Sequence, residues 1–415
     1  MRRLSLLLLT VCFAAVVNAQ VTVTNPGNTT PGLNPTYPDL ASAITALNAQ
    51  TAISGPVVIT LDPANPQTAP AGGYAITAIL AGASATNTVT LEGSANTLTA
   101  SPALTVGALN DAIFKIIGSD WVTIQNFTMQ ENAANTANTP ASNNMTEFGV
   151  ALFYGTITDG AQNNTIQNNT ISLNRTYLNA IGIYSNTRAS ATAVTTVAAA
   201  TTAAGSNSNN KVYGNNISNV NVGIWFIGSG IAGAFDEGND IGGGSAPTGN
   251  TISNWGNASV ASGYPSATSS VYCIYMNQQN NDRVSFNTIT SASTSIATSQ
   301  LGGVLKAYTI LAPSTTTTTN INNNTVTLTN TGATTSQMTG LTAQGMTSLA
   351  SATININNNN LINCSATGAS MTTGSFVGIL GTCAPGTLNI NGNTIRGTTV
   401  GSTGAGSFLG IQQQT

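Results

Sequence analysis

Few side chains in this sequence can do acid–base or metal chemistry. The chain has 12 acidic and 9 basic residues and no histidine. Catalytic triads and zinc sites in their usual histidine-containing forms are therefore excluded. No Asp-Asp or Asp-x-x-Asp pair falls on an expected strand. Any hydrolytic chemistry would have to come from carboxyl groups that are far apart in the sequence.

The densest group of carboxylates is Asp236, Glu237 and Asp240, which lie beside a glycine run. Three oxygen donors next to flexible glycines could bind Ca²⁺. Their spacing matches no known calcium loop, and the alternative is a solvated tip of an insertion. We therefore expect no cofactor, with Ca²⁺ at this cluster as the one exception to test.

The elements that position these residues follow from a repeat of the form apolar-x-x-Asn-[Thr/Asn]-apolar. It recurs roughly every 35 residues, a period that is typical of solenoids. Its Asn positions are Asn169, Asn215, Asn287, Asn324, Asn359 and Asn393, with a weaker copy at Asn250. We expect these Asn side chains to hydrogen-bond along the stack and so to have a structural role.

A second repeat, Gly followed by a branched aliphatic residue, lies between copies of the first, as in Gly182-Ile183 and Gly223-Ile224. Because strand residues alternate between faces, we expect the residues on either side of the Gly to point inward. The Gly, and the residue two positions after it, should then point outward.

The outward position carries an aromatic residue in three successive coils, namely Tyr184, Trp225 and Tyr275. Such a row could be a platform for sugar rings. The alternative is a stabilising cross-strand stack, or a patch that the neighbouring loops cover. By contrast, no two acids fall at equivalent positions of successive coils in this alignment of the repeats.

Threonine-rich solenoid faces can also bind ice when outward Thr rows are regular. The Thr of the Asn-type repeat lies between Asn and an apolar residue, and Asn replaces it twice. We therefore do not expect an ice-binding face.

The chain begins with features of a secretory signal peptide at residues 1–19, where Arg2 and Arg3 precede an apolar run. Residues 20–110 are expected to form an N-terminal cap, with one short helix from Tyr37 to about Asn48 and the first strands. Residues 111–415 are expected to form the solenoid. The last Gly-type strand, at Leu409-Gly410-Ile411, has no partner after it, so we expect the chain to be truncated in mid-coil and to continue into a further domain.

Composition limits the possible partners. Only 5% of residues are charged and the net charge is −3, so clustered basic charge for nucleic acid is not expected. No segment after the leader is apolar enough to span a membrane. Three cysteines follow the leader, Cys273, Cys364 and Cys383, and a disulfide between the last two is an open alternative.

Taken together, the helix-plus-strand opening and the Asn ladder resemble the right-handed parallel β-helix superfamily, the pectin-lyase-like fold. The opening Thr36-Tyr37-Pro38-Asp39-Leu40 resembles that of large exported surface proteins of Bacteroidetes-type bacteria. The resemblance implies an all-β, right-handed parallel β-helix with a helical cap, located outside the cell or on its surface. Enzymes of this fold usually act on acidic polysaccharides.

Two functions are compatible with these patterns. We expect a non-catalytic surface scaffold or adhesin that binds an extracellular polysaccharide or a cell-surface glycan through Tyr184, Trp225 and Tyr275. The alternative is a polysaccharide lyase or glycoside hydrolase, for which carboxylates from separate coils would have to converge beside the aromatic row.

Overall fold

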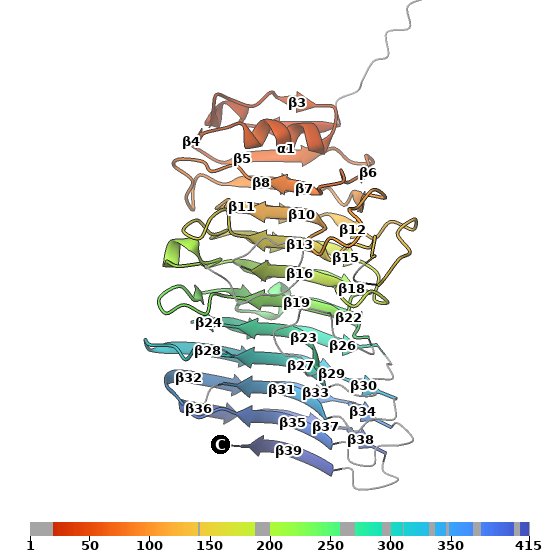
Figure 1. The fold of residues 1–415 in the computed structure, drawn as a ribbon, viewed down its shortest axis with the longest axis vertical. Coiled ribbons are helices and arrows are strands. Elements are labelled where there is room, and N and C mark those ends of the chain that lie inside the picture. The colour runs from red at the N-terminus through yellow and green to blue at the C-terminus, as the bar shows by residue number, and fades with distance from the viewer. Residues whose placement is uncertain are drawn as a thin grey trace, which may run out of the picture.

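The chain is a right-handed parallel β-helix, as the repeats predict (Figure 1). The computed structural model describes residues 20–139, 142–186, 200–257, 270–292, 300–309, 311–331, 337–345, 348–367, 375–401 and 407–414. The predicted signal peptide lies outside the described residues. Each complete coil contributes one strand to each of three long sheets, here called sheets 1, 2 and 3. Along the chain, a strand of sheet 1 comes first, then one of sheet 3 and then one of sheet 2.

Sheet 1 has 12 strands in the described residues, and all of its pairs are parallel except those that β1 makes. In spatial order its strands are β3 (Thr36–Tyr37), β1 (Val21–Thr24), β5 (Val57–Leu61), β8 (Val89–Glu92), β11 (Val122–Gln125), β14 (Thr165–Gln167), β17 (Lys211–Tyr213), β21 (Asp240–Ile241), β25 (Arg283–Ser285), β28 (Thr317–Asn322), β32 (Leu349–Asn357) and β36 (Pro385–Asn391).

Sheets 2 and 3 each have 10 strands in the described part of the chain. Sheet 2 consists of β7 (Tyr74–Ile76), β10 (Ala112–Ile117), β13 (Phe148–Phe153), β16 (Ile181–Asn186), β19 (Val222–Ile227), β23 (Ser270–Asn277), β27 (Gln300–Ala307), β31 (Met338–Gln344), β35 (Ser375–Thr382) and β39 (Ser407–Gln413). Sheet 3 consists of β6 (Gln67–Thr68), β9 (Thr97–Thr99), β12 (Thr128–Gln130), β15 (Thr170–Ser172), β18 (Asn216–Ser218), β22 (Thr251–Trp255), β26 (Thr288–Ser291), β29 (Thr325–Thr327), β33 (Asn360–Ile362) and β37 (Thr394–Arg396).

The remaining elements are short. They are strands β2 (Thr29–Thr30), β4 (Ala52–Ile53), β20 (Asp236–Glu237), β24 (Gln279–Asn280), β30 (Thr329–Asn330), β34 (Ser365–Ala366) and β38 (Thr399–Val400), and 3₁₀ turns η1 (Pro26–Asn28), η2 (Ala203–Gly205) and η3 (Ala246–Thr248). Among the described residues, no helix is both long and apolar enough to cross a membrane.

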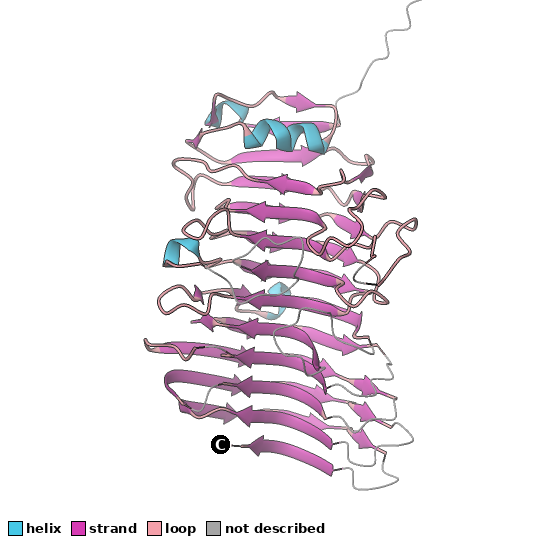
Figure 2. Cartoon of the chain, in the orientation of Figure 1, coloured by secondary structure: helices cyan, strands magenta, loops and turns pink. Residues whose placement is uncertain are grey.

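The predicted cap helix forms as α1 (Leu40–Asn48) at the N-terminal end of the stack (Figure 2). Asp39 caps it, because its side chain accepts a hydrogen bond of 2.7 Å from the backbone N–H of Ser42. Leu40, Ile44 and Leu47 are buried, as their spacing predicts. Parallel stacking, however, begins before residue 111: β5 already pairs with β8, with Val57 opposite Val89. The cap proper is therefore shorter than the expected range 20–110.

The Asn ladder is confirmed. The Oδ1 atom of Asn215 accepts hydrogen bonds of 3.1 Å from both the backbone N–H and the side-chain amide of Asn169, one coil earlier. The Nδ2 atom of Asn215 in turn donates to the carbonyl of Ile166 at 2.8 Å. The Oδ1 atoms of the next coils accept the same pair of bonds from the Asn before them, in the order Asn250, Asn287, Asn324, Asn359 and Asn393. The ladder thus satisfies turn groups that the stacked coils bury.

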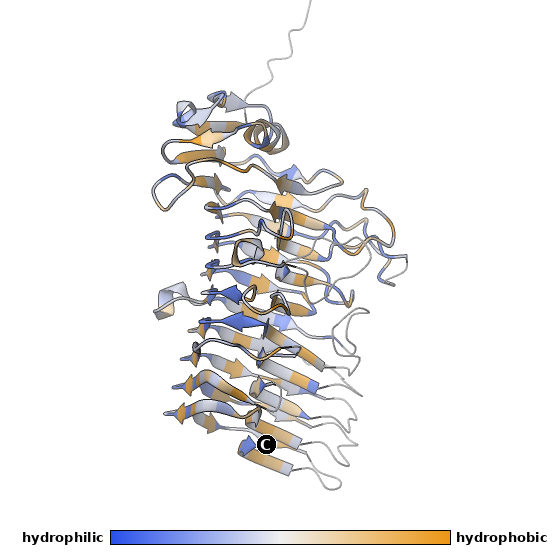
Figure 3. Cartoon of the chain, turned by 60° about the vertical axis from the view of Figure 1, so that its left-hand side comes forward, coloured by the Kyte–Doolittle hydropathy of each residue, from blue (hydrophilic) through white to orange (hydrophobic). Residues whose placement is uncertain are grey.

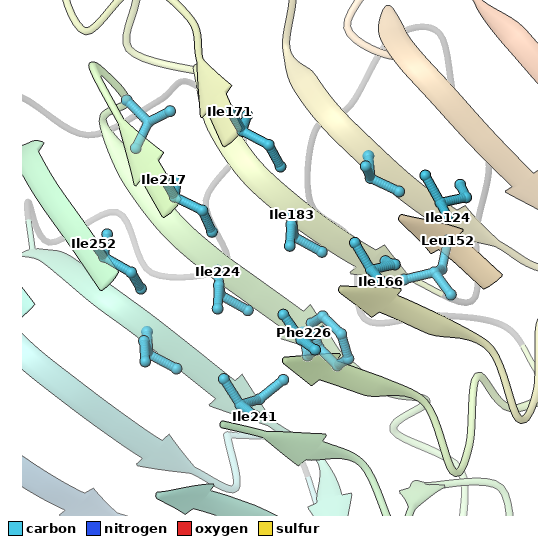
Figure 4. Close-up of a cluster of buried hydrophobic side chains, with 14 of the residues drawn as sticks. Ile124, Leu152, Ile166, Ile171, Ile183, Ile217, Ile224, Phe226, Ile241 and Ile252 are labelled. Atoms are coloured by element: carbon cyan, nitrogen blue, oxygen red, sulfur yellow. The ribbon is translucent and has the colours of Figure 1, made fainter. Parts of the chain in front are cut away.

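The Gly-type strands depart from strict alternation. A Cβ atom on Gly182 would lie 2.5 Å from Cγ2 of Ile217 in sheet 3 and 2.6 Å from the carbonyl oxygen of Gly223 in the next coil. The Gly therefore faces the interior, where sheets 2 and 3 approach each other closely, and so does the following Ile183 (Figure 4). Ile181, expected inward, faces outward instead.

Phe148, Val222 and Tyr272, which also precede the Gly position, likewise face outward. They belong to an apolar cluster on the outer face of sheet 2. The expectation failed because two consecutive residues face inward at the Gly position, which shifts the phase of the alternation. Figure 3 shows hydrophobic positions in layer after layer of the stack. Sheet 2 thus has apolar residues on both of its faces, whereas sheets 1 and 3 have them mainly inside.

The three cysteines are buried and free, so Cys364 and Cys383 do not form the disulfide considered above. Cys273 takes a Gly position and lies in the interior cluster, not outside as the alternation predicted.

Because sheets 2 and 3 approach each other closely at the Gly positions, even the methyl group of an alanine should destabilise the fold there. We expect Gly182→Ala to lower the free energy of unfolding by about 1–3 kcal/mol, because the added methyl group meets a backbone carbonyl that cannot move away on its own. Denaturant unfolding measures this. Gly72→Ala is the matched control, since nothing lies within 4 Å of its Cβ position. Equal stabilities of the two variants would contradict the packing argument.

Candidate active site

Two carboxyl groups of successive coils meet where sheet 2 begins. Ala112 of β10 is opposite Phe148 of β13, so the preceding residues, Asp111 and Glu147, occupy equivalent positions. Oε2 of Glu147 accepts a hydrogen bond of 2.9 Å from the backbone N–H of Asp111. This contradicts the expectation that no two acids are equivalent in successive coils. The repeat alignment missed the pair because β10 has Ile113 in place of the marker Gly.

Glu147 is fully buried. Its Oε1 accepts a hydrogen bond of 2.7 Å from the Asn143 side chain and a further one from the hydroxyl of Tyr177, which is also buried. Burial raises the pKa of Glu147 well above its usual range, and the Tyr177 hydrogen bond lowers it only in part. Burial and the neighbouring Glu147 also raise the pKa of Tyr177. Burial therefore favours the protonated form of both groups.

Asp111 is 5% exposed, and burial raises its pKa to about 6. Lys115 of the same strand lowers this pKa, whereas Glu131 raises it. The Oδ2 atom of Asp111 is buried and has no hydrogen-bond partner among the described residues. Burial also lowers the pKa of Lys115, against the pull of Asp111 and Glu147. The pKa values of Asp111 and Lys115 therefore depend on each other and on two carboxyl groups of the next coil, Glu131 and Glu147.

Glu131 connects this group to a cavity of about 390 Å³. Its carboxylate accepts hydrogen bonds from the backbone N–H (2.8 Å) and the hydroxyl (3.0 Å) of Thr146, the residue before Glu147. It also accepts one of 2.8 Å from Asn135. The cavity is lined by Glu131, Asn132, Ala133, Asn135, Thr136, Met145, Leu173, Asn174 and Thr176. Amide and hydroxyl groups with three apolar side chains, Ala133, Met145 and Leu173, suit the mixed surface of a sugar.

The chemistry open to this arrangement is acid–base catalysis. Glycoside hydrolysis requires two carboxyl groups, one as acid and one as base or nucleophile, and groups in different environments can divide these roles. Asp111, with a pKa of about 6, holds its proton in mildly acidic solution. Glu131 lines the cavity and is only partly buried.

The predicted aromatic row forms in register but is buried. Tyr184 is opposite Trp225, which is opposite Tyr275, and all three point away from the interior of the helix. Their exposed fractions are 1%, 0% and 9%. Tyr184 stacks on Phe148 with ring centroids 4.3 Å apart. The row is therefore part of a second apolar cluster and offers no open platform to a sugar.

The acidic cluster is dispersed by the fold. Asp236 is fully buried and accepts hydrogen bonds of 2.9 Å from the backbone of Asn207 and from the side chain of Gln279. Glu237 is exposed and accepts one from Asn281. Asp240 binds Arg283 and Tyr213. The described residues contain no group of three potential ligands that could hold a metal ion, and the three carboxylates considered for Ca²⁺ bind separate partners.

Comparison with known proteins gives neighbours of the fold. No family model and no curated protein matches the chain. Among solved structures, it is similar to the catalytic domain of a GH87 alpha-1,3-glucanase in complex with nigerose, at 15% identity and a TM-score of 0.33, covering 86% of this chain and 61% of that one. A variant of that catalytic domain in complex with tetrasaccharides matches at 12% identity and a TM-score of 0.33, covering 83% of this chain and 60% of that one. The chain spans about three fifths of their length, and this level of similarity does not identify a substrate.

The expectation of a non-catalytic scaffold or adhesin is wrong. It depended on an exposed aromatic row and on acids that never meet in successive coils. The burial of Tyr184, Trp225 and Tyr275 and the pairing of Asp111 with Glu147 remove both premises.

Asp236 predicts how stability depends on pH. Burial raises its pKa from 3.8 to about 7, so the folded state binds a proton that the unfolded state has already lost above about pH 4. Its contribution to stability is complete below pH 4 and is lost as the pH rises through 7. With about 1.4 kcal/mol for each pKa unit, the loss is on the order of 4 kcal/mol at most.

Unfolding free energies measured from about pH 4 to about pH 8 test this. Asp236→Asn resembles the protonated form and should remove this part of the pH dependence. Glu237→Gln, on the neighbouring exposed residue, should keep it. An unchanged slope in Asp236→Asn would show that Asp236 is ionised throughout.

Proposed function

We propose that the chain is a glycoside hydrolase that cleaves a polysaccharide at the cavity beside Glu131. The observation that carries this proposal is the meeting of Asp111, Glu131 and Glu147 from neighbouring coils. Glu147 directly precedes Phe148, whose backbone N–H donates to the Asp111 carbonyl, and Glu131 accepts from the backbone N–H of Thr146. Convergence of carboxyl groups from separate coils favours a hydrolase over a scaffold.

The roles follow from the environments. Asp111 is the candidate general acid, because burial keeps it protonated up to about pH 6 and its Oδ2 has no protein partner among the described residues. Glu131 is the candidate base or nucleophile, because it lines the cavity. Glu147 is a positioning residue, since it holds the backbone N–H of Asp111 and the hydroxyl of Tyr177.

A polysaccharide lyase is the second candidate, on one observation. Burial lowers the pKa of Lys115, and a lysine that loses its proton more easily can abstract a proton from a uronate. Against this, Lys115 is the one cationic side chain of the four, and burial favours its neutral form, so the site has little positive charge to bind the carboxylate of a uronate. The hydrolase is therefore the better supported reaction. The signal peptide predicted at residues 1–19 favours an extracellular substrate, and we extend the proposal to a secreted or surface-bound enzyme.

Release of reducing ends from a panel of neutral and acidic polysaccharides tests the proposal. We expect Asp111→Asn and Glu131→Gln each to lower kcat by roughly 10²–10⁴-fold. Glu237→Gln should leave kcat unchanged, since Glu237 is an exposed residue of β20 and makes no hydrogen bond to Asp111, Glu131 or Glu147 in the described part of the chain. Activity should fall as the pH rises above about 6, because the general acid then loses its proton.

Three results would contradict the hydrolase. One is that no polysaccharide in the panel is cleaved. A second is that cleavage proceeds equally well in Asp111→Asn. A third is that the products carry the double bond of an elimination, which would establish the lyase instead.

A further inference from the structure

A second cavity lies at the turns between sheets 1 and 3, in the same coils as the cavity beside Glu131. Its volume is about 310 Å³. We call it the turn cavity, and it is lined by Glu92, Ser94, Ala95, Asn126, Phe127, Thr128, Asn168 and Thr170. These residues belong to the ends of β8, β12 and β15 and to the turns after β8, β11 and β14, so successive coils form the cavity together.

The turn after β8 differs from the turns of the next two coils. Four residues connect β8 to β9, whereas two connect β11 to β12 and two connect β14 to β15. Ser94 and Ala95 of the longer turn line the cavity and have φ angles of 48° and 61°. Residues other than Gly, Asn and Asp rarely adopt this left-handed conformation, and such strained backbone clusters at binding and active sites. The longer turn is thus a local departure from the repeat at the place where the cavity forms.

The carboxylate of Glu92 is held in place at this cavity. Its Oε1 accepts a hydrogen bond of 2.8 Å from the backbone N–H of Ser94. Its Oε2 accepts hydrogen bonds of 2.7 Å from the side chain of Gln125 and 2.9 Å from that of Asn126. Because a carboxylate has about four acceptor positions, one lone pair of Oε1 stays open to a hydroxyl group of a ligand.

Four further polar side chains of the turn cavity can bind a ligand, namely those of Ser94, Thr128, Asn168 and Thr170. None of the four makes a side-chain hydrogen bond to another described residue, and Asn168 and Thr170 are exposed. Hydroxyl, amide and carboxylate groups beside Ala95 suit the hydroxyl groups and apolar ring faces of a sugar. Among the described residues that line the two cavities none is basic, so neither cavity offers a cation to an acidic sugar.

The two cavities lie at opposite ends of β12 and β15, which are neighbours in sheet 3 (Figure 1). Thr128 and Thr170 are the first residues of these strands and line the turn cavity. Glu131 and Leu173 directly follow the same strands and line the other cavity. Three residues along a strand span about 10 Å, which is longer than one sugar ring. A single ligand can therefore fill both cavities only if it is a chain of sugar units that crosses sheet 3.

We propose that the turn cavity is a second binding site for the polysaccharide, and that a neutral sugar chain lies along β12 and β15 between the two cavities. The identity of the ligand rests on the proposed function, whereas the position of the site rests on the cavity itself. Two sites that bind one chain at the same time hold it more tightly than either site alone. The affinity for a neutral oligosaccharide should therefore rise with its length until both cavities are filled.

Titration calorimetry with neutral oligosaccharides of increasing length, from a disaccharide upward, tests the proposal. They are prepared by partial acid hydrolysis of the neutral polysaccharides of the panel, and Glu131→Gln in the full chain prevents their cleavage. In this background, Asn168→Gly removes an exposed amide and should raise the Kd of the long chains about 3–10-fold. Gly suits the φ of 55° at this position, and Gly214 has the equivalent position in the next coil. Thr170→Val, which removes an exposed hydroxyl, should have the same effect.

Asn358→Gly is the matched control. Asn358 is exposed, has a φ of 56° at the same turn position and is followed by Gly392 in the next coil, but it does not line the turn cavity. It should keep the Kd of the background chain, and melting temperatures show that each variant is folded.

A Kd that does not depend on the length of the oligosaccharide would overturn the proposal. So would Kd values in Asn168→Gly and Thr170→Val that equal the value in Asn358→Gly. Cleavage by the wild type is a separate measurement. Cleavage without an effect of Asn168→Gly on binding would keep the hydrolase and refute the turn cavity, whereas length-dependent binding through Asn168 without cleavage would do the reverse.

Discussion

The structure depends on the hydrogen-bonded ladder of buried Asn side chains. A turn inside a stack of coils has backbone groups that water cannot reach, and a buried polar group without a partner costs about 1–3 kcal/mol. Asn215 meets this need in both directions, since it accepts from Asn169 and donates to Asn250. Because each amide bonds the coils before and after it, the ladder also fixes the register of every strand. The turn cavity and the pairing of Asp111 with Glu147 both require that register.

The Gly positions determine the cross-section. They let sheet 2 approach sheet 3 so closely that Ile217 packs against the backbone of Gly182. Two inward residues in succession then put Phe148 and Tyr184 on the outer face, where they stack. Sheet 2 is therefore covered on both sides, and Asp111 and Glu147 lie at its edge. The same burial that hides the aromatic row raises the pKa values of these carboxyl groups. Burial at sheet 2 therefore explains both why the aromatic row is not open to a ligand and why the pKa values of Asp111 and Glu147 are raised.

The sequence predicts what repeats and little of what interrupts the repeat. The Asn ladder, helix α1 and strand β5 follow from local patterns. Which residues of the Gly-type strand face inward does not follow from such patterns. Strict alternation along a strand does not take into account that sheets 2 and 3 approach each other closely at the Gly positions. Asp111 was missed since Ile113 takes the Gly position, and the role of Glu131 was missed since its contact with Thr146 crosses a segment without the repeat pattern. The turn cavity was missed since it forms between the turns of successive coils. Each miss concerns a contact between residues that are far apart in the sequence.

The scarcity of charge has two consequences that fit together. With 5% charged residues, the outer faces of sheets 1 and 3 are largely uncharged, and the Arg283–Asp240 ion pair on sheet 1 is an exception. The few acids that remain are easily buried, and burial without a full set of charged partners is what changes the pKa of Asp111 and Asp236. In a solenoid each coil contacts only its neighbours. The acids and the two cavities of the early coils can therefore depart from the repeat without disturbing the regular coils that follow.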